Sequence, residues 1–185
     1  FAYKPGPGIR TESDPLWIHA PGSQGRTHRA LAALEDSVLS AADIEGVVLR
    51  YGALTGPGTY YGPDGAFIDL IRRRLLPLVD GGHGLYGFVD VTDAAGATVA
   101  ALTGPPGVYN IVDDEPVEAR TWIAAVADRL GARTPLRLPG WLLRVGPATT
   151  LAYLLGHQPA ATNALARDVL HWAPKLPTWR EQLLG

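Results

Sequence analysis

The chain has 185 residues, of which 46% are hydrophobic and 18% are charged, and this composition is typical of globular proteins rather than fibrous or disordered ones. It contains no cysteine, which excludes disulfides, cysteine-ligated metal sites and thiol nucleophiles. The net charge of −2 at pH 7 gives no reason to expect nucleic acid or an anionic membrane as a partner. No apolar run approaches the ~20 residues that span a bilayer, so we expect a cytoplasmic protein.

The chain contains no methionine, and its first residue is Phe1. An initiator methionine is normally removed only when a small residue follows it, so we expect the chain to begin inside a longer protein. Among the 16 basic residues, lysine occurs only at Lys4 and Lys175. This arginine bias favours a GC-rich, actinobacterial source.

The predicted elements alternate between helices and strands. Residues 1–24 are rich in proline and glycine, lack a hydrophobic period and are predicted to be a loop. The spacing of apolar residues then predicts, in chain order, a helix over 26–41, a strand over 45–51, a Gly/Pro-rich loop over 52–65, a helix over 66–76, a strand over 85–91, a helix over 94–102, a strand over 107–112 and a helix over 117–130. Short helices separated by prolines fill the remainder.

This order favours an α/β fold in which helices cover both faces of a parallel sheet. Only two of the strands are strongly hydrophobic, which is too few to cover the helices. We therefore expect a segment that precedes Phe1 to supply further strands.

The loop after Tyr51 is the candidate ligand site, because open α/β sheets bind ligands at the carboxyl ends of their strands. Its glycines allow a backbone to approach a ligand closely, and Thr55, Thr59, Tyr60 and Tyr61 offer hydroxyl groups. The alternative is a surface connection that binds nothing. No histidine has a partner four residues away, so the sequence predicts no metal site.

Four segments resemble the C-terminal portion of the extended short-chain dehydrogenases/reductases, the NAD-dependent epimerase/dehydratase type. They are GVVLRYGALTGPGT (46–59), FVDVTDAAGATVAAL (88–102), GVYNIVDDEP (107–116) and TNALARDVLHWAPKLPTWREQL (162–183). The resemblance implies the second half of a doubly wound Rossmann-type parallel sheet together with a small helical substrate-capping lobe. It assigns residues 1–52 and 91–112 to the Rossmann-type domain, and residues 53–90 and 113–185 to the capping region.

The resemblance also implies NAD or NADP as cofactor. The family binds the pyrophosphate through a glycine-rich loop in its first half, so the resemblance implies that the main phosphate site lies upstream of Phe1. The family places the stretch after the RYG strand against the nicotinamide, which corresponds to Ala53, Leu54 and Thr55. The N-terminal half is expected as a separate chain or as an earlier segment of the same chain, and a homodimer is a further expectation.

The family's catalytic pair is a tyrosine and a lysine four residues later, on the helix before the RYG strand. Counting back from Glu35, which matches a frequent family glutamate, Thr27 stands at the tyrosine position and Leu31 at the lysine position. A threonine hydroxyl is far less acidic than a phenol and leucine cannot donate a proton, so an atypical catalytic set is expected. The candidate catalytic residues are Tyr51, Tyr60, Tyr61 and Thr27.

Other departures argue against a sugar-nucleotide substrate. Asp90 replaces a family histidine, while Tyr86 and Ala160 replace two arginines that contact substrate phosphate. Asn163 is retained, and the candidate substrate-binding residues are Thr59, Asp90 and Asn163. Asp93 is also retained, and we interpret it first as a helix cap.

Three functions remain open, and each requires a bound small molecule. The first is an NAD(P)-dependent oxidoreductase or epimerase/dehydratase with an atypical catalytic set, which we place ahead. The second is a non-redox lyase, isomerase or cyclase that reuses the same pocket. The third is a non-catalytic sensor that binds a dinucleotide.

Overall fold

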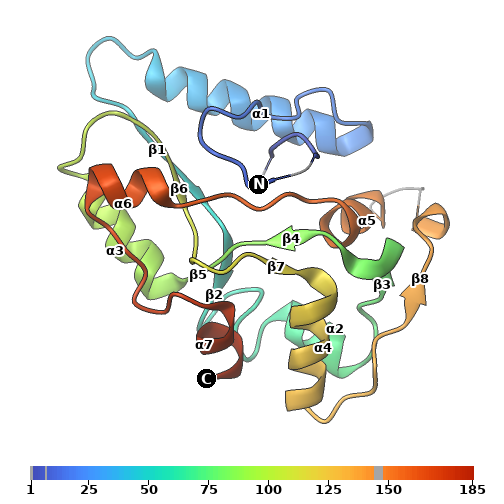
Figure 1. Cartoon of the computed structure of the whole chain (residues 1–185). Coiled ribbons are helices and arrows are strands. Elements are labelled where there is room, and N and C mark those ends of the chain that lie inside the picture. Colours follow the sequence, from blue (N-terminus) through green and yellow to red (C-terminus); the bar gives the residue numbers. More distant parts are fainter. Residues whose placement is uncertain (1, 7, 144–147) are drawn as a thin grey trace.

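A computed structural model describes residues 2–6, 8–143 and 148–185 (Figure 1). The helices are α1 (Gly22–Leu39), α2 (Ala66–Arg72), α3 (Val91–Ala101), α4 (Ala119–Arg129), α5 (Ala148–Gly156), α6 (Ala164–Leu170) and α7 (Trp179–Leu184), with short 3₁₀ turns η1 (Asp80–Gly82) and η2 (Gly140–Leu143). The strands are β1 (Val47–Tyr51), β2 (Ala53–Thr55), β3 (Leu78–Val79), β4 (Leu85–Tyr86), β5 (Phe88–Asp90), β6 (Gly107–Ile111), β7 (Val117–Glu118) and β8 (Arg137–Leu138).

The strands form pairs, and most of the pairs are parallel. The pairs β1–β6, β2–β5 and β3–β8 are parallel, whereas β4–β7 is antiparallel. The predicted α/β class is therefore confirmed. No helix within the described residues is long and apolar enough to cross a membrane.

The β1–β6 pair divides at Gly52, and β5 fills the space between the diverging strands. The Gly52 amide still donates to Ile111 of β6, but the Ala53 amide donates to the Gly87 carbonyl, and Asp113 donates its amide to Phe88. A Cβ at Gly52 would lie 2.4 Å from the Gly87 carbonyl oxygen. Glycine is therefore required where the strand changes partners, because any side chain would collide with the neighbouring backbone.

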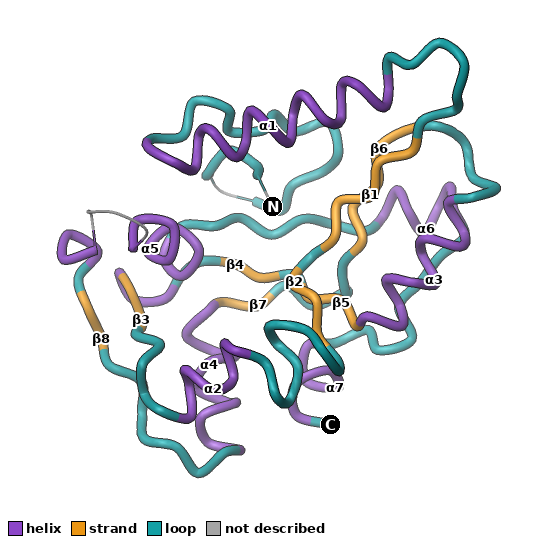
Figure 2. Tube along the Cα trace, turned by 180° about the vertical axis from the view of Figure 1, so that it is seen from behind, coloured by secondary structure: helices purple, strands orange, loops and turns teal. Residues whose placement is uncertain are grey.

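Helices cover both faces of the β1–β6 pair, with α1 on one side and α3 and α6 on the other (Figures 1 and 2). Alternate residues of a strand point to opposite faces. Leu49 and Tyr51 accordingly pack against the α3–α6 core, while Arg50 pairs with Glu35 of α1. A second core joins α2, α4 and α7 around the buried rings of Phe88 and Trp122.

Most of α1 is exposed. Only Gly25 and His28 are buried among its residues, and the apolar side chains of Leu31, Leu34 and Leu39 are 42%, 62% and 43% exposed. The sequence predicted this helix from the same apolar stripe. In the described residues, however, the stripe has little to pack against.

The N-terminus of α3 differs from the prediction. The helix begins at Val91, and its cap is Asp90, whose carboxylate accepts the Thr92 amide at 2.8 Å. Asp93 is not the cap. Its carboxylate instead accepts the backbone amides of Lys175 and Leu176 at 2.9 and 3.0 Å, which ties the C-terminal segment to the first turn of α3.

Candidate functional site

The loop that follows β2 encloses a cavity, called here the loop cavity. It has a volume of about 740 Å³ and is lined by Ala53, Leu54, Thr59, Tyr60, Tyr61 and Asp64, among others. The cavity lies at the carboxyl end of the β1–β2 strand, where α/β folds place their ligands. The structure thus brings together five of the candidate residues predicted from the sequence, namely Ala53, Leu54, Thr59, Tyr60 and Tyr61.

The glycines of this loop serve its own packing more than a ligand. A Cβ at Gly62 would lie 2.1 Å from the Gly56 carbonyl oxygen, so the loop folds back on itself at a distance that only glycine permits. The Thr59 hydroxyl donates to the same Gly56 carbonyl at 2.8 Å. Gly58 is different, since its φ is +76° and nothing lies within 4 Å of where its Cβ would be.

Thr55 points away from the loop cavity into a buried polar network. Its hydroxyl donates to the Gln182 side-chain oxygen at 2.8 Å, and the Gln182 amide donates to the Asp113 carboxylate at 3.4 Å. Asp113 also accepts the Phe88 backbone amide at 3.2 Å. Burial, together with the nearby carboxylates of Asp114 and Glu115, raises the pKa of Asp113 to about 8 against the lowering effect of the Phe88 amide.

The three candidate tyrosines have different surroundings. The Tyr51 phenol shares a hydrogen bond of 2.6 Å with Thr98 of α3, on the face of β1 opposite α1. The Tyr61 ring stacks on Phe67 with centroids 4.6 Å apart, and burial raises the pKa of Tyr61 to about 12. Tyr60 is 71% exposed and lines the loop cavity, so its phenol is the most accessible of the three.

Thr27 and Leu31 line a separate cavity of about 530 Å³ between α1 and β1, called here the α1–β1 cavity. The Thr27 hydroxyl donates to the Ser23 carbonyl at 3.3 Å within the helix. Leu31 contributes only apolar surface. Tyr51 also lines this cavity, but its hydroxyl is engaged by Thr98, so the structure does not bring the Tyr51 phenol to Thr27.

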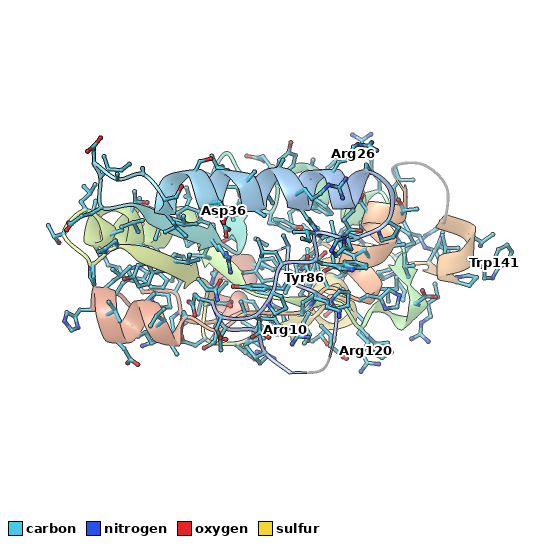
Figure 3. The ribbon with its side chains drawn as sticks, turned by 90° about the horizontal axis from the view of Figure 1, so that it is seen from above. Arg10, Arg26, Asp36, Tyr86, Arg120 and Trp141 are labelled. Carbon is cyan, nitrogen blue, oxygen red and sulfur yellow. The ribbon has the colours of Figure 1, made fainter. Side chains whose placement is uncertain are left out.

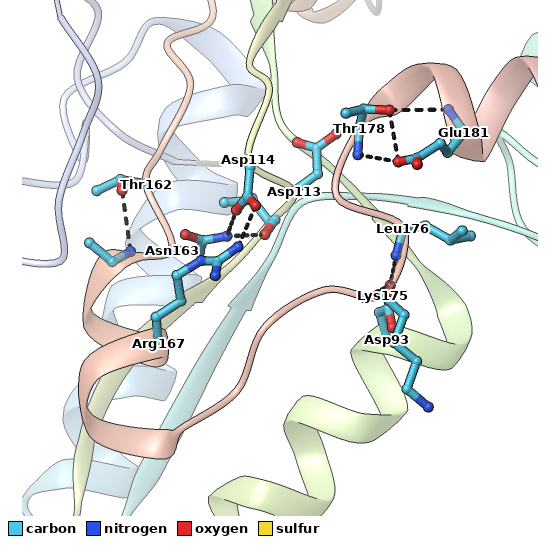
Figure 4. A network of polar contacts seen from close by, with 12 residues as sticks. Asp93, Asp113, Asp114, Thr162, Asn163, Arg167, Lys175, Leu176, Thr178 and Glu181 are labelled. Carbon is cyan, nitrogen blue, oxygen red and sulfur yellow. Dashed lines mark hydrogen bonds and ion pairs between the residues drawn. The ribbon is translucent and has the colours of Figure 1, made fainter.

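The candidate substrate-binding residues are divided between two places. Asp90 lies beside the loop, since a Cβ at Gly56 would be 2.7 Å from its carboxylate. Asn163 is buried at the start of α6, where its amide donates to the Val112 carbonyl and to the Asp114 carboxylate, both at 2.8 Å (Figure 4). Its side chain therefore fixes the segment after β6. The substrate roles of Thr59, Asp90 and Asn163 stay predictions.

A third cavity was not anticipated from the sequence. It lies between the first turns of α1 and helix α5, has a volume of about 920 Å³, and is called here the α1–α5 cavity. Trp17, Arg26, Asp80, Tyr153 and His157 line it, among others. One signal was available, since Trp17 is a large aromatic residue in an otherwise Pro/Gly-rich segment. The described residues contain no cluster of three or more side chains that would hold a metal ion.

Three solved structures are similar to this chain in fold. The human epimerase family protein SDR39U1 with NADPH matches with a TM-score of 0.74 and 22% identity, covering 98% of this chain and 60% of the other. DesIV, a dTDP-glucose 4,6-dehydratase from Streptomyces venezuelae with NAD and TYD bound, matches with a TM-score of 0.71 and 17% identity. The match covers 98% of this chain and 54% of DesIV. The UDP-glucose 4-epimerase of Thermus thermophilus with NAD matches with a TM-score of 0.65 and 22% identity. The match covers 98% of this chain and 58% of the epimerase.

The chain has the fold of the extended short-chain dehydrogenases/reductases. The resemblance inferred from its four segments is thereby confirmed, including the correspondence to the C-terminal portion of that fold. No protein-family model matches the chain.

A curated relative from Streptomyces sp is 40% identical over 190 residues and is named 3-diazoavenalumate denitrifying reductase. The match covers 99% of this chain and 61% of the relative. The chain therefore spans about three-fifths of the length of this relative, and between 54% and 60% of the three solved structures.

Proposed function

We propose that this chain forms the substrate-facing part of an NAD(P)-dependent reductase that replaces the nitrogen of a small diazo compound with hydride. The observation that carries the proposal is the 40% identity to a denitrifying reductase over 99% of the chain. The departures from the family's catalytic pair, Thr27 and Leu31, support the same reaction for the chemical reason given below.

A nicotinamide cofactor fits the chain in part. The stretch of Ala53 and Leu54 borders the loop cavity, and this stretch would face the nicotinamide end. The backbone of Thr55 continues the same strand, although its side chain is turned toward Gln182. The segment Gly82–Gly87 matches G-x-G-x-x-G in sequence, but it contains β4 and leads into β5 rather than into a helix. The pyrophosphate would therefore be bound by another part of the protein. When bound in its reduced form, the cofactor supplies a hydride.

Reduction of a diazonium carbon consumes no proton. The balance is R–N₂⁺ + H⁻ → R–H + N₂, in which the C–N bond breaks, a C–H bond forms and both electrons come from the hydride. Reduction of a carbonyl, by contrast, needs a proton for the oxygen, and this is the task of a general acid. A helix that presents Thr27 and Leu31 in place of a phenol and an ammonium group is therefore suited to an acceptor that is already cationic.

The residues around the loop cavity would hold the acceptor and exclude water. Thr59 fixes the loop through its bond to Gly56, and Asp90 stands beside the loop with one oxygen capping α3. Asp64 lines the loop cavity itself, and a carboxylate there would stabilise a cationic diazonium group. Tyr60 is the candidate proton donor that we retain for an acceptor that needs one, because its phenol is exposed at the cavity.

The test uses the full-length protein with nicotinamide cofactors that carry deuterium at C4 and a diazo arene carboxylic acid as acceptor. We expect one deuterium at the carbon that carried nitrogen, together with release of one equivalent of dinitrogen. Deuterium from solvent at that carbon would contradict the proposal. Binding of the cofactor without turnover would instead support a sensor, and cofactor-independent conversion would support a non-redox lyase, isomerase or cyclase.

A further inference from the structure

The α1–α5 cavity joins two parts of the chain that are far apart in sequence. Its walls come from the N-terminal loop, the first turns of α1, η1 and helix α5. Figure 1 shows the N-terminal end of α1 on the same side of the molecule as α5. At about 920 Å³ the cavity is within the range of small-molecule sites.

Two aromatic rings form one wall of this cavity. Trp17 and Tyr153 lie with ring centroids 5.3 Å apart and an angle of 41° between the ring planes. Hydrogen bonds hold both residues in place. The Tyr153 hydroxyl donates to the Tyr3 carbonyl at 3.1 Å, and Trp17 bonds through its backbone to Ala2 at 2.7 Å and to the His28 ring at 2.9 Å. A rigid aromatic wall of this kind favours a planar ring, since stacked rings gain more than buried area alone provides.

Among the charged side chains that line the α1–α5 cavity, Arg26 is free to bind an anionic ligand. Asp80 accepts the Gly140 amide at 2.7 Å and lies 3.4 Å from the His157 ring nitrogen, so its carboxylate is engaged within the fold. Arg26 is exposed, and its side chain forms no ion pair or hydrogen bond with any described residue. Figure 3 shows Arg26 at the surface of α1, near its N-terminal end.

We propose that the α1–α5 cavity binds a planar aromatic carboxylate, with the ring against Trp17 and Tyr153 and the carboxylate at Arg26. The proposal goes beyond the proposed function, because this cavity shares no lining residue with the loop cavity that would hold the acceptor.

The test measures binding rather than turnover. The probe is 4-hydroxycinnamate, which has an aromatic ring and a carboxylate but no diazo group, titrated into the full-length protein by calorimetry. We expect saturable binding that weakens about 10-fold or more in Arg26→Gln, because a charge-assisted hydrogen bond is lost. Trp17→Leu should weaken it to a similar degree. The neutral analogue 4-vinylphenol should bind equally to the parent protein and to Arg26→Gln.

The matched control is Arg133→Gln. Arg133 is likewise exposed, has no ion pair among the described residues and lines none of the three cavities, so its substitution should leave the affinity unchanged. Absence of saturable binding, or equal losses in Arg26→Gln and Arg133→Gln, would overturn the proposal. The probe contains no nitrogen to lose, so the binding test is independent of the hydride-transfer test. Failure of hydride transfer would leave the binding result valid, and absence of binding would leave the hydride-transfer result valid.

Discussion

Glu35 of α1 and Arg50 of β1 form a two-point ion pair, with 2.9 Å between Nε and Oε1 and 2.6 Å between Nη2 and Oε2. Both side chains are largely buried, with Arg50 13% and Glu35 16% exposed. Arg50 also donates to the Tyr3 hydroxyl at 2.7 Å, and Tyr3 donates in turn to Asn110 of β6 at 2.7 Å. The pair therefore connects α1 to the strands through one continuous polar network.

Replacing Glu35 by Gln should destabilise the protein strongly. The substitution leaves the Arg50 charge buried without its counter-ion, and breaking a buried pair in this way costs about 3 kcal/mol. Urea unfolding of the full-length protein measures the loss. The double variant Glu35→Leu with Arg50→Met should lose less than the sum of the two single substitutions. A loss below ~0.5 kcal/mol in Glu35→Gln, the range of an ordinary surface substitution, would show that the network contributes little.

Substitutions at the former catalytic positions should have little effect on turnover. A missing general acid or base usually lowers the rate by ~10²–10⁴-fold, and neither Thr27 nor Leu31 can act as one unaided. We expect Thr27→Ala and Leu31→Ala to retain kcat within about 3-fold in the assay with a diazo acceptor, far less than the loss of an acid or base. If Thr27→Ala abolishes activity while all tyrosine variants retain it, a threonine-centred, non-redox mechanism becomes the leading account.

Tyrosine-to-phenylalanine substitutions separate the two classes of acceptor. Tyr60→Phe should leave kcat unchanged with a diazo acceptor, because that reduction uses no proton. With a carbonyl acceptor it should lower kcat by ~10²–10⁴-fold. Tyr51→Phe and Tyr61→Phe serve as comparisons, since the Tyr51 phenol is bonded to Thr98 and the Tyr61 phenol is buried. A large loss of kcat in Tyr51→Phe alone would identify Tyr51 as the proton donor.

Asp113 should make stability fall as the pH rises. Its pKa is about 8 in the folded protein, above the value near 4 of an unfolded aspartate, so between about pH 4 and pH 8 the folded state holds a proton that the unfolded state has lost. The free energy of unfolding then decreases by up to about 1.4 kcal/mol per pH unit over this window and levels off above it.

The isosteric variant Asp113→Asn removes this titration. Urea unfolding at pH 5, 7 and 9 should show a shallower decrease in the variant than in the parent protein. Asp128→Asn, at an exposed carboxylate on α4, is the control and should keep the steep dependence. Identical pH profiles for the parent and Asp113→Asn would contradict this prediction.

Residues 1–185 expressed alone should fold poorly. The apolar side chains of Leu31 and Leu34 are exposed on α1, and β1 pairs only with β6 among the described strands, which leaves an unpaired strand edge. Exposed stripes of this kind mark surfaces that another segment covers. We expect a broad, non-cooperative melt and self-association, measured by calorimetry and sedimentation. A monomer with a sharp cooperative melt would refute the expected N-terminal half as the partner of this surface.

The sequence by itself determined the order of helices α1 to α4 and of strands β1 and β6. It did not predict β2, which lies in the predicted loop, or the division of the predicted strand over 85–91 into β4 and β5. Hydrophobic period and glycine or proline punctuation are local properties, and they placed β1, β6 and α4 within one or two residues of their observed bounds. They also placed the Gly/Pro-rich loop at the carboxyl end of a strand, where the loop cavity lies. The predicted cap of α3 was Asp93, whereas the observed cap is Asp90. Asp90, Thr92 and Asp93 are all capable of capping, and only the backbone conformation distinguishes them.

Only the tertiary structure decided which candidate side chains meet. The alternation of β1 turns Tyr51 toward α3, packing buries Tyr61 among aromatic rings, and Thr55 finds its partner on α7, although all three belong to one sequence segment. Trp17 and Tyr153 meet at the α1–α5 cavity from opposite ends of the chain. Such long-range contacts depend on how helices and strands pack in three dimensions, which no local period of the sequence encodes.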